Sequence, residues 1–139
     1  MKKKILISEP FIDKKEINSV ANVLKSGWIT QGPKVREFEN LFSKYHNSKY
    51  AVALSSCTTA LHLMLLAAGI KKNDEVIIPS FTWVSTANAV LYIGAKPVFV
   101  DVNIKNYNID INLIKKKITK KTKAILAVHM YGGICNLRE

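Results

Sequence analysis

A run of five small residues, Ser-Ser-Cys-Thr-Thr at positions 55–59, is the segment of this chain best suited to bind an anion. It follows the apolar residues 50–54 and opens a largely apolar stretch that reads as a helix to about Ala68. Unpaired backbone N–H groups and the dipole of a helix start favour negative charge, and hydroxyl groups add donors. The segment has neither the glycines and lysine of a Walker loop nor the dinucleotide fingerprint. A phosphate monoester suits this pocket, and simple N-capping by serine or threonine explains the same residues equally well.

An aromatic residue, Trp83, lies at a second strand-to-helix junction. The apolar residues 75–78 precede Pro79-Ser80-Phe81-Thr82-Trp83, and a helical pattern follows. Beside a phosphate pocket, the indole ring can lie flat against a heteroaromatic ring. The alternative is core packing, which is what most tryptophans do.

Four apolar runs, at residues 50–54, 75–78, 97–100 and 124–128, are predicted strands. Each ends at polar or aromatic residues, and the last leads directly into His129 and Tyr131. In an open parallel α/β sheet, ligands bind in the crevice outside the carboxyl ends of the strands. The four strand ends therefore predict one site, at which His129 and Tyr131 face the same crevice.

Helical patterns lie before and between these strands. Asp13 and Glu16 form a capping-box pair for a helix that ends at Gly27, and Pro33 suits the first turn of a second helix. Further helices are predicted at residues 58–68, 83–93 and 110–118. This alternation indicates an α/β fold with a parallel sheet. The helix at 58–68 is apolar almost all round, which predicts burial in a core larger than this chain supplies or at an oligomer interface.

The composition excludes several classes of protein. The chain has 139 residues and a net charge of +11, but its only arginines are Arg36 and Arg138. A lysine-rich solvated face therefore fits better than a nucleic-acid surface, because base readers favour the guanidinium fork. The cysteines, Cys57 and Cys135, form no metal-binding pair and are expected to be free thiols. No apolar run reaches the ~20 residues of a membrane span, and no signal peptide is recognised, so a cytoplasmic protein is expected.

Several segments together resemble the N-terminal third of the DegT/StrS-type sugar aminotransferases, which use pyridoxal 5'-phosphate (PLP) on a fold-type I scaffold. The matching stretches are SGWITQGPKVREFE at 26–39, AVALSSCTTALHLML at 51–65, DEVIIPSFTWVSTANAVLYIGAKPVFVDV at 74–102, NID at 108–110 and TKAILAVHMYG at 122–132. They occur in the family's order and spacing. The resemblance implies that residues 1–139 are the N-terminal portion of the PLP-binding large domain, mainly a parallel sheet flanked by helices and incomplete. Residues 1–49 would form a helical N-terminal segment and residues 50–139 the βα repeats.

The same resemblance implies the roles of individual residues. The backbone amides and hydroxyl of Cys57 and Thr58 would hold the PLP phosphate, and Trp83 would stack on the pyridine ring. Trp28 and Thr30, in the loop at 27–32, would border the pocket of a nucleotide-sugar substrate. His129 and Tyr131 would touch that substrate. The implied reaction is transfer of an amino group, typically from glutamate, to a keto-sugar on a nucleotide carrier, in a homodimer and in the biosynthesis of cell-surface polysaccharide, lipopolysaccharide or amino sugars.

The chain departs from the family pattern at two places. Cys57 stands where family members usually have glycine or alanine, and Gly133-Ile134-Cys135-Asn136 replaces the usual proline-alanine-aspartate run. In the family, the Schiff-base lysine and the aspartate at the pyridinium nitrogen lie further along the chain than Glu139. No catalytic residue is therefore assigned within the 139 residues, and the chain alone is expected to be inactive. A sugar dehydratase on the same scaffold and a non-catalytic truncated remnant are the alternatives.

Overall fold

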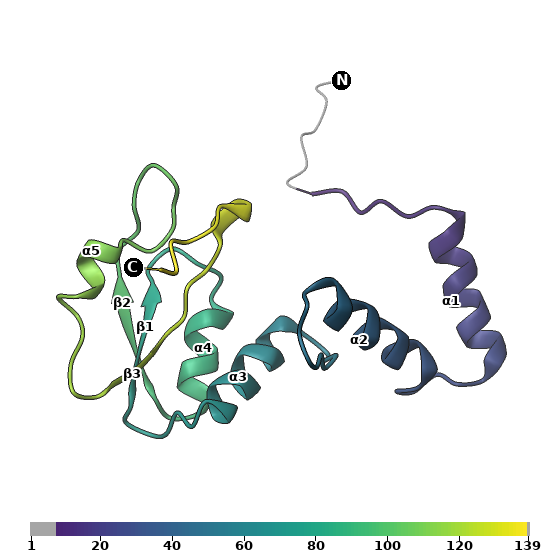
Figure 1. Cartoon of the computed structure of the whole chain (residues 1–139), viewed down its shortest axis with the longest axis horizontal. Helices are drawn as coiled ribbons and strands as arrows, with labels where there is room; N and C mark the ends of the chain where they lie inside the picture. The colour runs from purple at the N-terminus through teal and green to yellow at the C-terminus, as the bar shows by residue number, and fades with distance from the viewer. Residues whose placement is uncertain (1–7, 139) are drawn as a thin grey trace. The chain divides into compact units, whose positions relative to one another are not determined.

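The computed structural model describes residues 8–138, which divide into two compact units, one up to Ala53 and one from Leu54 onward. Figure 1 labels their helices and strands in chain order. The N-terminal unit contains two helices, and the C-terminal unit contains a sheet with its flanking helices. Among the described residues, no helix is both long enough and apolar enough to cross a membrane.

In the N-terminal unit, the first helix begins and ends where the sequence predicts, and the second helix begins where it predicts. Helix α1 spans Lys14–Ser26 and is capped by a complete capping box, in which the Lys15 N–H donates to Asp13 Oδ1 over 2.6 Å and the Asp13 N–H donates to Glu16 Oε2 over 2.8 Å. It ends at Gly27, whose φ of 72° lies in the left-handed region that glycine adopts without steric cost. Helix α2 spans Pro33–Tyr45, with the proline in its first turn as predicted.

A small parallel sheet forms the centre of the C-terminal unit. Its strands are β1 at Glu75–Pro79, β2 at Lys96–Val100 and β3 at Thr122–Ile125. The order in space is β2-β1-β3, and β1 pairs with both neighbours in parallel. The parallel sheet predicted from the alternating pattern is thus confirmed.

Helices flank this sheet (Figure 1). Helix α3 spans Cys57–Ala67 and α4 spans Ser85–Tyr92; α4 packs against β1 and β2, and α3 packs against α4. A single turn, α5 at Ile111–Ile114, follows β2, and a 3₁₀ turn, η1 at Met130–Gly132, follows β3.

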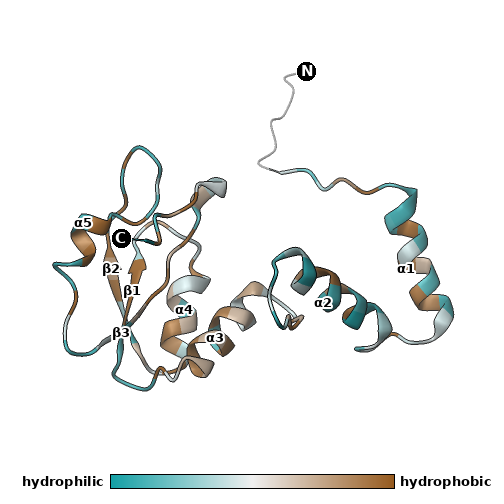
Figure 2. Cartoon of the chain, viewed as in Figure 1, coloured by the Kyte–Doolittle hydropathy of each residue, from teal (hydrophilic) through white to brown (hydrophobic). Residues whose placement is uncertain are grey.

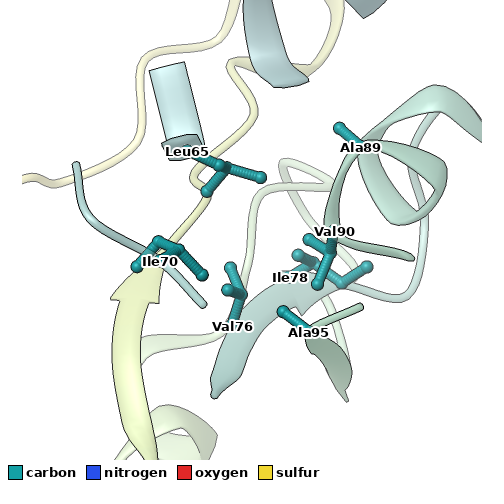
Figure 3. Close-up of a cluster of buried hydrophobic side chains, with 7 residues drawn as sticks. All are labelled: Leu65, Ile70, Val76, Ile78, Ala89, Val90 and Ala95. Carbon is teal, nitrogen blue, oxygen red and sulfur yellow. The ribbon is translucent and has the colours of Figure 1, made fainter. Parts of the chain in front are cut away.

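The core lies on both faces of β1, whose five residues are all buried. Val76 and Ile78 face a cluster shared with α3 and α4, which Figure 3 shows, and Ile77 faces a second cluster on the opposite side. Alternate residues of a strand point to opposite faces, so a strand of consecutive apolar residues can be buried only when both faces are covered. The first cluster consists of Leu65, Ile70, Val76, Ile78, Ala89, Val90 and Ala95; the second consists of Ile77, Val100, Ile109 and Ile114.

Helix α3 is apolar along its length (Figure 2), but only Leu65 is buried. Leu63, Met64 and Leu66 are exposed by 43%, 59% and 46%. The prediction of a buried helix is therefore met on one side only, within the residues that the structure describes.

The predicted strand at residues 50–54 is wrong, because these residues adopt no regular structure. A strand needs a neighbour with which to exchange backbone hydrogen bonds, and among the described residues no strand pairs with this segment. The Ala53 N–H instead donates to Glu39 Oε1 over 2.8 Å.

Two other elements differ from their predicted bounds: one helix is shorter than predicted, and one strand begins and ends earlier in the chain. The helix expected at 110–118 stops at Ile114, where three consecutive lysines begin. The β-branched isoleucines at positions 111, 114 and 118 weaken a short helix. The strand expected at 124–128 forms instead at Thr122–Ile125, so His129 lies four residues beyond its end.

Candidate cofactor site

The start of helix α3 presents two backbone donors that its own cap does not use. Ser56 is the N-cap: its Oγ accepts the Thr59 N–H over 3.1 Å, and its carbonyl accepts the Ala60 N–H over 3.1 Å. Among the hydrogen bonds of the described residues, the N–H groups of Cys57 and Thr58 remain unpaired. An anion at this helix start would thus meet two free N–H groups and the positive end of the helix dipole.

A hydrogen bond joins this helix start to the start of α4. Thr58 Oγ1 donates to Ser85 Oγ over 2.9 Å, and both residues are half-buried. Trp83 lies two residues before Ser85, in the loop that leaves β1. The first turn of α3 and the loop that carries Trp83 are therefore held side by side.

The side chain of Trp83 is 78% exposed, although most tryptophans pack in a core. The backbone carbonyl of Trp83 accepts the Thr86 N–H over 3.0 Å. This bond holds the backbone in the turn that begins α4, and the indole ring stays open to a ligand. An exposed indole beside an anion-binding helix start can stack on a heteroaromatic ring that carries a phosphate.

His129 and Tyr131 lie on the segment that follows β3. His129 is exposed, and its Nδ1 accepts the Cys135 N–H over 3.1 Å. In the neutral imidazole the proton then resides on Nε2, which makes Nε2 a hydrogen-bond donor. Tyr131 is 80% exposed, and its ring lies 6.5 Å from that of Phe81, two residues before Trp83. The structure therefore links the segment at 129–131 to the loop of Trp83.

Trp28 and Thr30 belong to the N-terminal unit, which is described here by itself. The Trp28 Nε1–H donates to the Gln31 carbonyl over 3.0 Å, and the indole ring covers Gly32 so closely that a Cβ there would collide with it. Both residues line a cavity of about 430 Å³ in this unit. The indole N–H is thus used within its own loop, and the ring and the Thr30 hydroxyl remain for contact with a ligand.

No group of three or more His, Cys, Asp or Glu side chains within residues 8–138 is arranged to hold a metal ion. Cys57 is an exposed free thiol, and Cys135 is buried with its Sγ 3.1 Å from the Val128 carbonyl oxygen.

Solved structures with the same arrangement of helices and strands define the class of this protein. One is the PLP form of Spr1654 of Streptococcus pneumoniae, assigned as a sugar aminotransferase, with a TM-score of 0.91 and 38% identity over 96% of this chain and 34% of that one. Another is a GDP-4-keto-6-deoxy-D-mannose-3-dehydratase of Escherichia coli with bound hydrated PLP, with a TM-score of 0.88 and 36% identity over 95% of this chain and 36% of that one. The chain has the fold of the PLP-dependent sugar aminotransferases.

The family follows from the sequence comparison. The model of the DegT/DnrJ/EryC1/StrS aminotransferase family matches residues 10–139, and the chain belongs to this family. A UDP-4-amino-4-deoxy-L-arabinose–oxoglutarate aminotransferase of Shewanella sediminis is 49% identical over 94% of this chain and 34% of its own length. The chain thus spans about a third of the length of such relatives. The resemblance found in the sequence motifs is confirmed.

The residues of the site fit PLP. The free N–H groups of Cys57 and Thr58 suit its phosphate, and the exposed face of Trp83 suits its pyridine ring. Cys57 contributes its backbone N–H whatever its side chain, so the departure from glycine or alanine at this position leaves the donor in place.

Sequence reasoning missed three residues of this region: Ser85, Phe81 and Asn108. Ser85 follows Trp83 by two residues at a helix start, which is a signal that could have suggested a polar role. Asn108 was part of a matching motif, but nothing local in the sequence indicates its partners, which lie 22 and 25 residues away.

Proposed function

We propose that this chain forms the phosphate-binding and ring-binding part of a PLP-dependent enzyme that transfers an amino group from an amino acid to a nucleotide-linked keto-sugar. The observation that carries the proposal is the bond between Thr58 and Ser85, since it holds two unpaired helix N–H groups beside the exposed Trp83.

 The proposed donor is glutamate, and the proposed product belongs to the biosynthesis of cell-surface polysaccharide, lipopolysaccharide or amino sugars.

In this proposal, Cys57 and Thr58 bind the PLP phosphate through their backbone N–H groups. The Thr58 hydroxyl, which donates to Ser85 Oγ in this structure, would add a third donor when its proton turns to a phosphate oxygen. Trp83 stacks on the pyridine ring and so fixes the plane of that ring. Bound PLP would supply the electron sink through which an amino group is moved.

The substrate is proposed to lie against Tyr131 and His129 on one side of the crevice. The proton on His129 Nε2 is available to a sugar hydroxyl or phosphate oxygen, because Nδ1 is occupied by the Cys135 N–H. Trp28 and Thr30 are proposed to contact the nucleotide sugar as well, from the cavity of the N-terminal unit.

The reaction also needs a Schiff-base lysine and a carboxylate at the pyridine nitrogen. The chain spans about a third of the length of its relatives. We propose that both groups belong to the remaining two thirds of such a protein, and that the enzyme works as a homodimer.

The test uses the protein expressed from its whole gene, purified with PLP and given ¹⁵N-glutamate and nucleotide-linked keto-sugars. An aminotransferase releases 2-oxoglutarate and leaves the ¹⁵N label in the sugar, which mass spectrometry detects. Absence of both products with every keto-sugar tried, from protein that binds PLP, would refute the proposed reaction.

A sugar dehydratase is the second candidate, favoured by the likeness to the Escherichia coli GDP-4-keto-6-deoxy-D-mannose-3-dehydratase. In the same experiment it would yield a sugar that has lost the elements of water and carries no ¹⁵N. The two candidates are therefore separated by the mass of one product.

A further inference from the structure

Two loops at the carboxyl edge of the sheet are held together by one buried side chain. The first, residues 101–110, leaves β2 and is closed by an isolated bridge between Val102 and Ile109. The second, residues 126–135, leaves β3 and contains η1. Asn108 belongs to the first loop, is only 5% exposed, and reaches the second loop through its side chain.

Both ends of the Asn108 amide are used. Its Oδ1 accepts the Met130 N–H over 3.0 Å, and its Nδ2 donates to the Gly133 carbonyl over 3.1 Å. Its backbone is paired as well, because its N–H donates to Asn106 Oδ1 and its carbonyl accepts the Asn103 N–H. A buried amide paired in this way fixes the distance between the two loops.

The two side-chain bonds enclose Tyr131, whose φ of 51° lies in the left-handed region. Tyr107, directly before Asn108, has a φ of 58°. A bulky residue in this region is strained, and such strain persists only where the surrounding structure holds it. Asn108 supplies that support, because it bonds to the residue before Tyr131 and to the carbonyl two residues after it.

The rings of the two tyrosines meet as a result. Tyr107 and Tyr131 lie edge to face with centroids 6.1 Å apart, and Phe81 lies 5.7 Å from Tyr107 and 6.5 Å from Tyr131. These separations are those of favourable aromatic pairs. Phe81 belongs to the loop of Trp83, so the three rings connect all three strand ends.

We propose that Asn108 is a positioning residue, which holds Tyr131 against Phe81 and Tyr107 so that its exposed face meets the sugar substrate. This inference rests on the proposed function for the identity of the ligand. The placement of Tyr131 by Asn108 stands independently of it.

The first measurement follows the placement of Tyr131 directly. The protein from the whole gene is labelled with 3-fluorotyrosine, and the ¹⁹F signal of Tyr131 is assigned with Tyr131→Phe. Asn108→Ala is expected to move this signal toward that of a freely exposed tyrosine, because the ring leaves its two neighbours. Asn112→Ala, at an exposed asparagine four residues away, is the matched control and is expected to leave it in place.

Asn108→Asp is the second variant for this measurement, in case Asn108→Ala does not fold. It keeps the acceptor for the Met130 N–H and loses the donor to the Gly133 carbonyl, so a smaller displacement in the same direction is expected. Methyl signals of Val76 and Ile78 report whether the core is intact. An unchanged Tyr131 signal in a folded Asn108 variant would overturn the proposal.

The second measurement asks whether Asn108 acts through Tyr131. With UDP-4-amino-4-deoxy-L-arabinose and 2-oxoglutarate as the probe reaction, Asn108→Ala is expected to raise KM for the sugar about fivefold to tenfold, with kcat changed less. In a Tyr131→Ala background the same substitution is expected to add nothing. Additive effects would contradict the proposal.

If the wild-type protein does not turn over this probe, the proposed reaction fails for that sugar, and the ¹⁹F result alone decides the role of Asn108. The two failures are thus distinguishable.

Discussion

Thr58 Oγ1 and Ser85 Oγ lie 2.9 Å apart and share a hydrogen bond, although the two residues are 27 positions apart in the sequence. The bond joins the first turns of two neighbouring helices at the carboxyl edge of the sheet. Thr58 is the donor of this bond, and its hydroxyl proton can turn from Ser85 to a phosphate oxygen when a ligand binds. Ser85 therefore holds the Thr58 side chain at the helix start until a ligand takes its proton.

Removal of either hydroxyl is expected to weaken PLP binding. Thr58→Val keeps the shape of the side chain and removes the donor, so the Kd for PLP should rise about tenfold to a hundredfold, as for one hydrogen bond to a charged group. Ser85→Ala should give a smaller rise, because the backbone N–H groups and the Thr58 hydroxyl remain. Titration of the protein from the whole gene with PLP, followed by absorbance, measures both. Ser43→Ala, in α2, is the control, and equal affinities in all four proteins would contradict the assignment.

Substitution of Trp83 tests the stacking role. Trp83→Ala should raise the Kd for PLP about threefold to tenfold, the range expected for loss of an aromatic pair, and Trp83→Phe should restore most of the affinity. The part of the tryptophan quenching by PLP that is lost in Trp83→Phe provides a direct signal. Tyr45→Ala removes an equally exposed aromatic ring in the other unit and should leave the affinity unchanged. A wild-type affinity in Trp83→Ala would show that the ring does not contact the cofactor.

The features predicted correctly from the sequence are those encoded by neighbouring residues. The capping box of Asp13 and Glu16, the stop at Gly27 and the start at Pro33 each depend on residues within one turn of helix. The parallel sheet was also predictable, since alternating apolar runs and helical patterns leave few other folds.

The features that were missed depend on distant partners. Residues 50–54 have the composition of a strand, but a strand forms only beside another, and that is a property of the whole sheet. The partners of Ser85 and Asn108 lie more than 20 residues away, so no local pattern reveals them. The roles assigned to Cys57, Thr58 and Trp83 remain predictions, and the variants above test those of Thr58 and Trp83.

The burial of β1 on both faces predicts where the C-terminal unit is most sensitive. Ile77 is completely buried between β2, α5 and the loop that follows β2. Ile77→Ala should lower the free energy of unfolding by about 2–5 kcal/mol, because it removes apolar contacts and leaves a cavity. Ile104→Ala, at a residue that is 81% exposed, should change it by no more than about 0.5 kcal/mol. Urea unfolding monitored by circular dichroism compares the two, and similar midpoints would contradict the buried position of Ile77.

The capping box of α1 predicts a local dependence on pH. The Lys15 N–H and then the Glu16 side chain hold the pKa of Asp13 below its ordinary value of 3.8. A carboxylate with a lowered pKa in the folded state stabilises that state above its ordinary pKa, and the stabilisation is lost as the pH falls through the lowered value. The start of α1 should therefore fray only below pH 3.8. The ¹H–¹⁵N signal of the Lys15 amide, followed from pH 6 downward, should titrate with a midpoint below 3.8.

Asp13→Asn keeps a capping oxygen without a charge, so this titration should vanish while the helix remains. A midpoint at or above 3.8, or an unchanged titration in Asp13→Asn, would show that the Asp13 carboxylate does not cap the helix in solution.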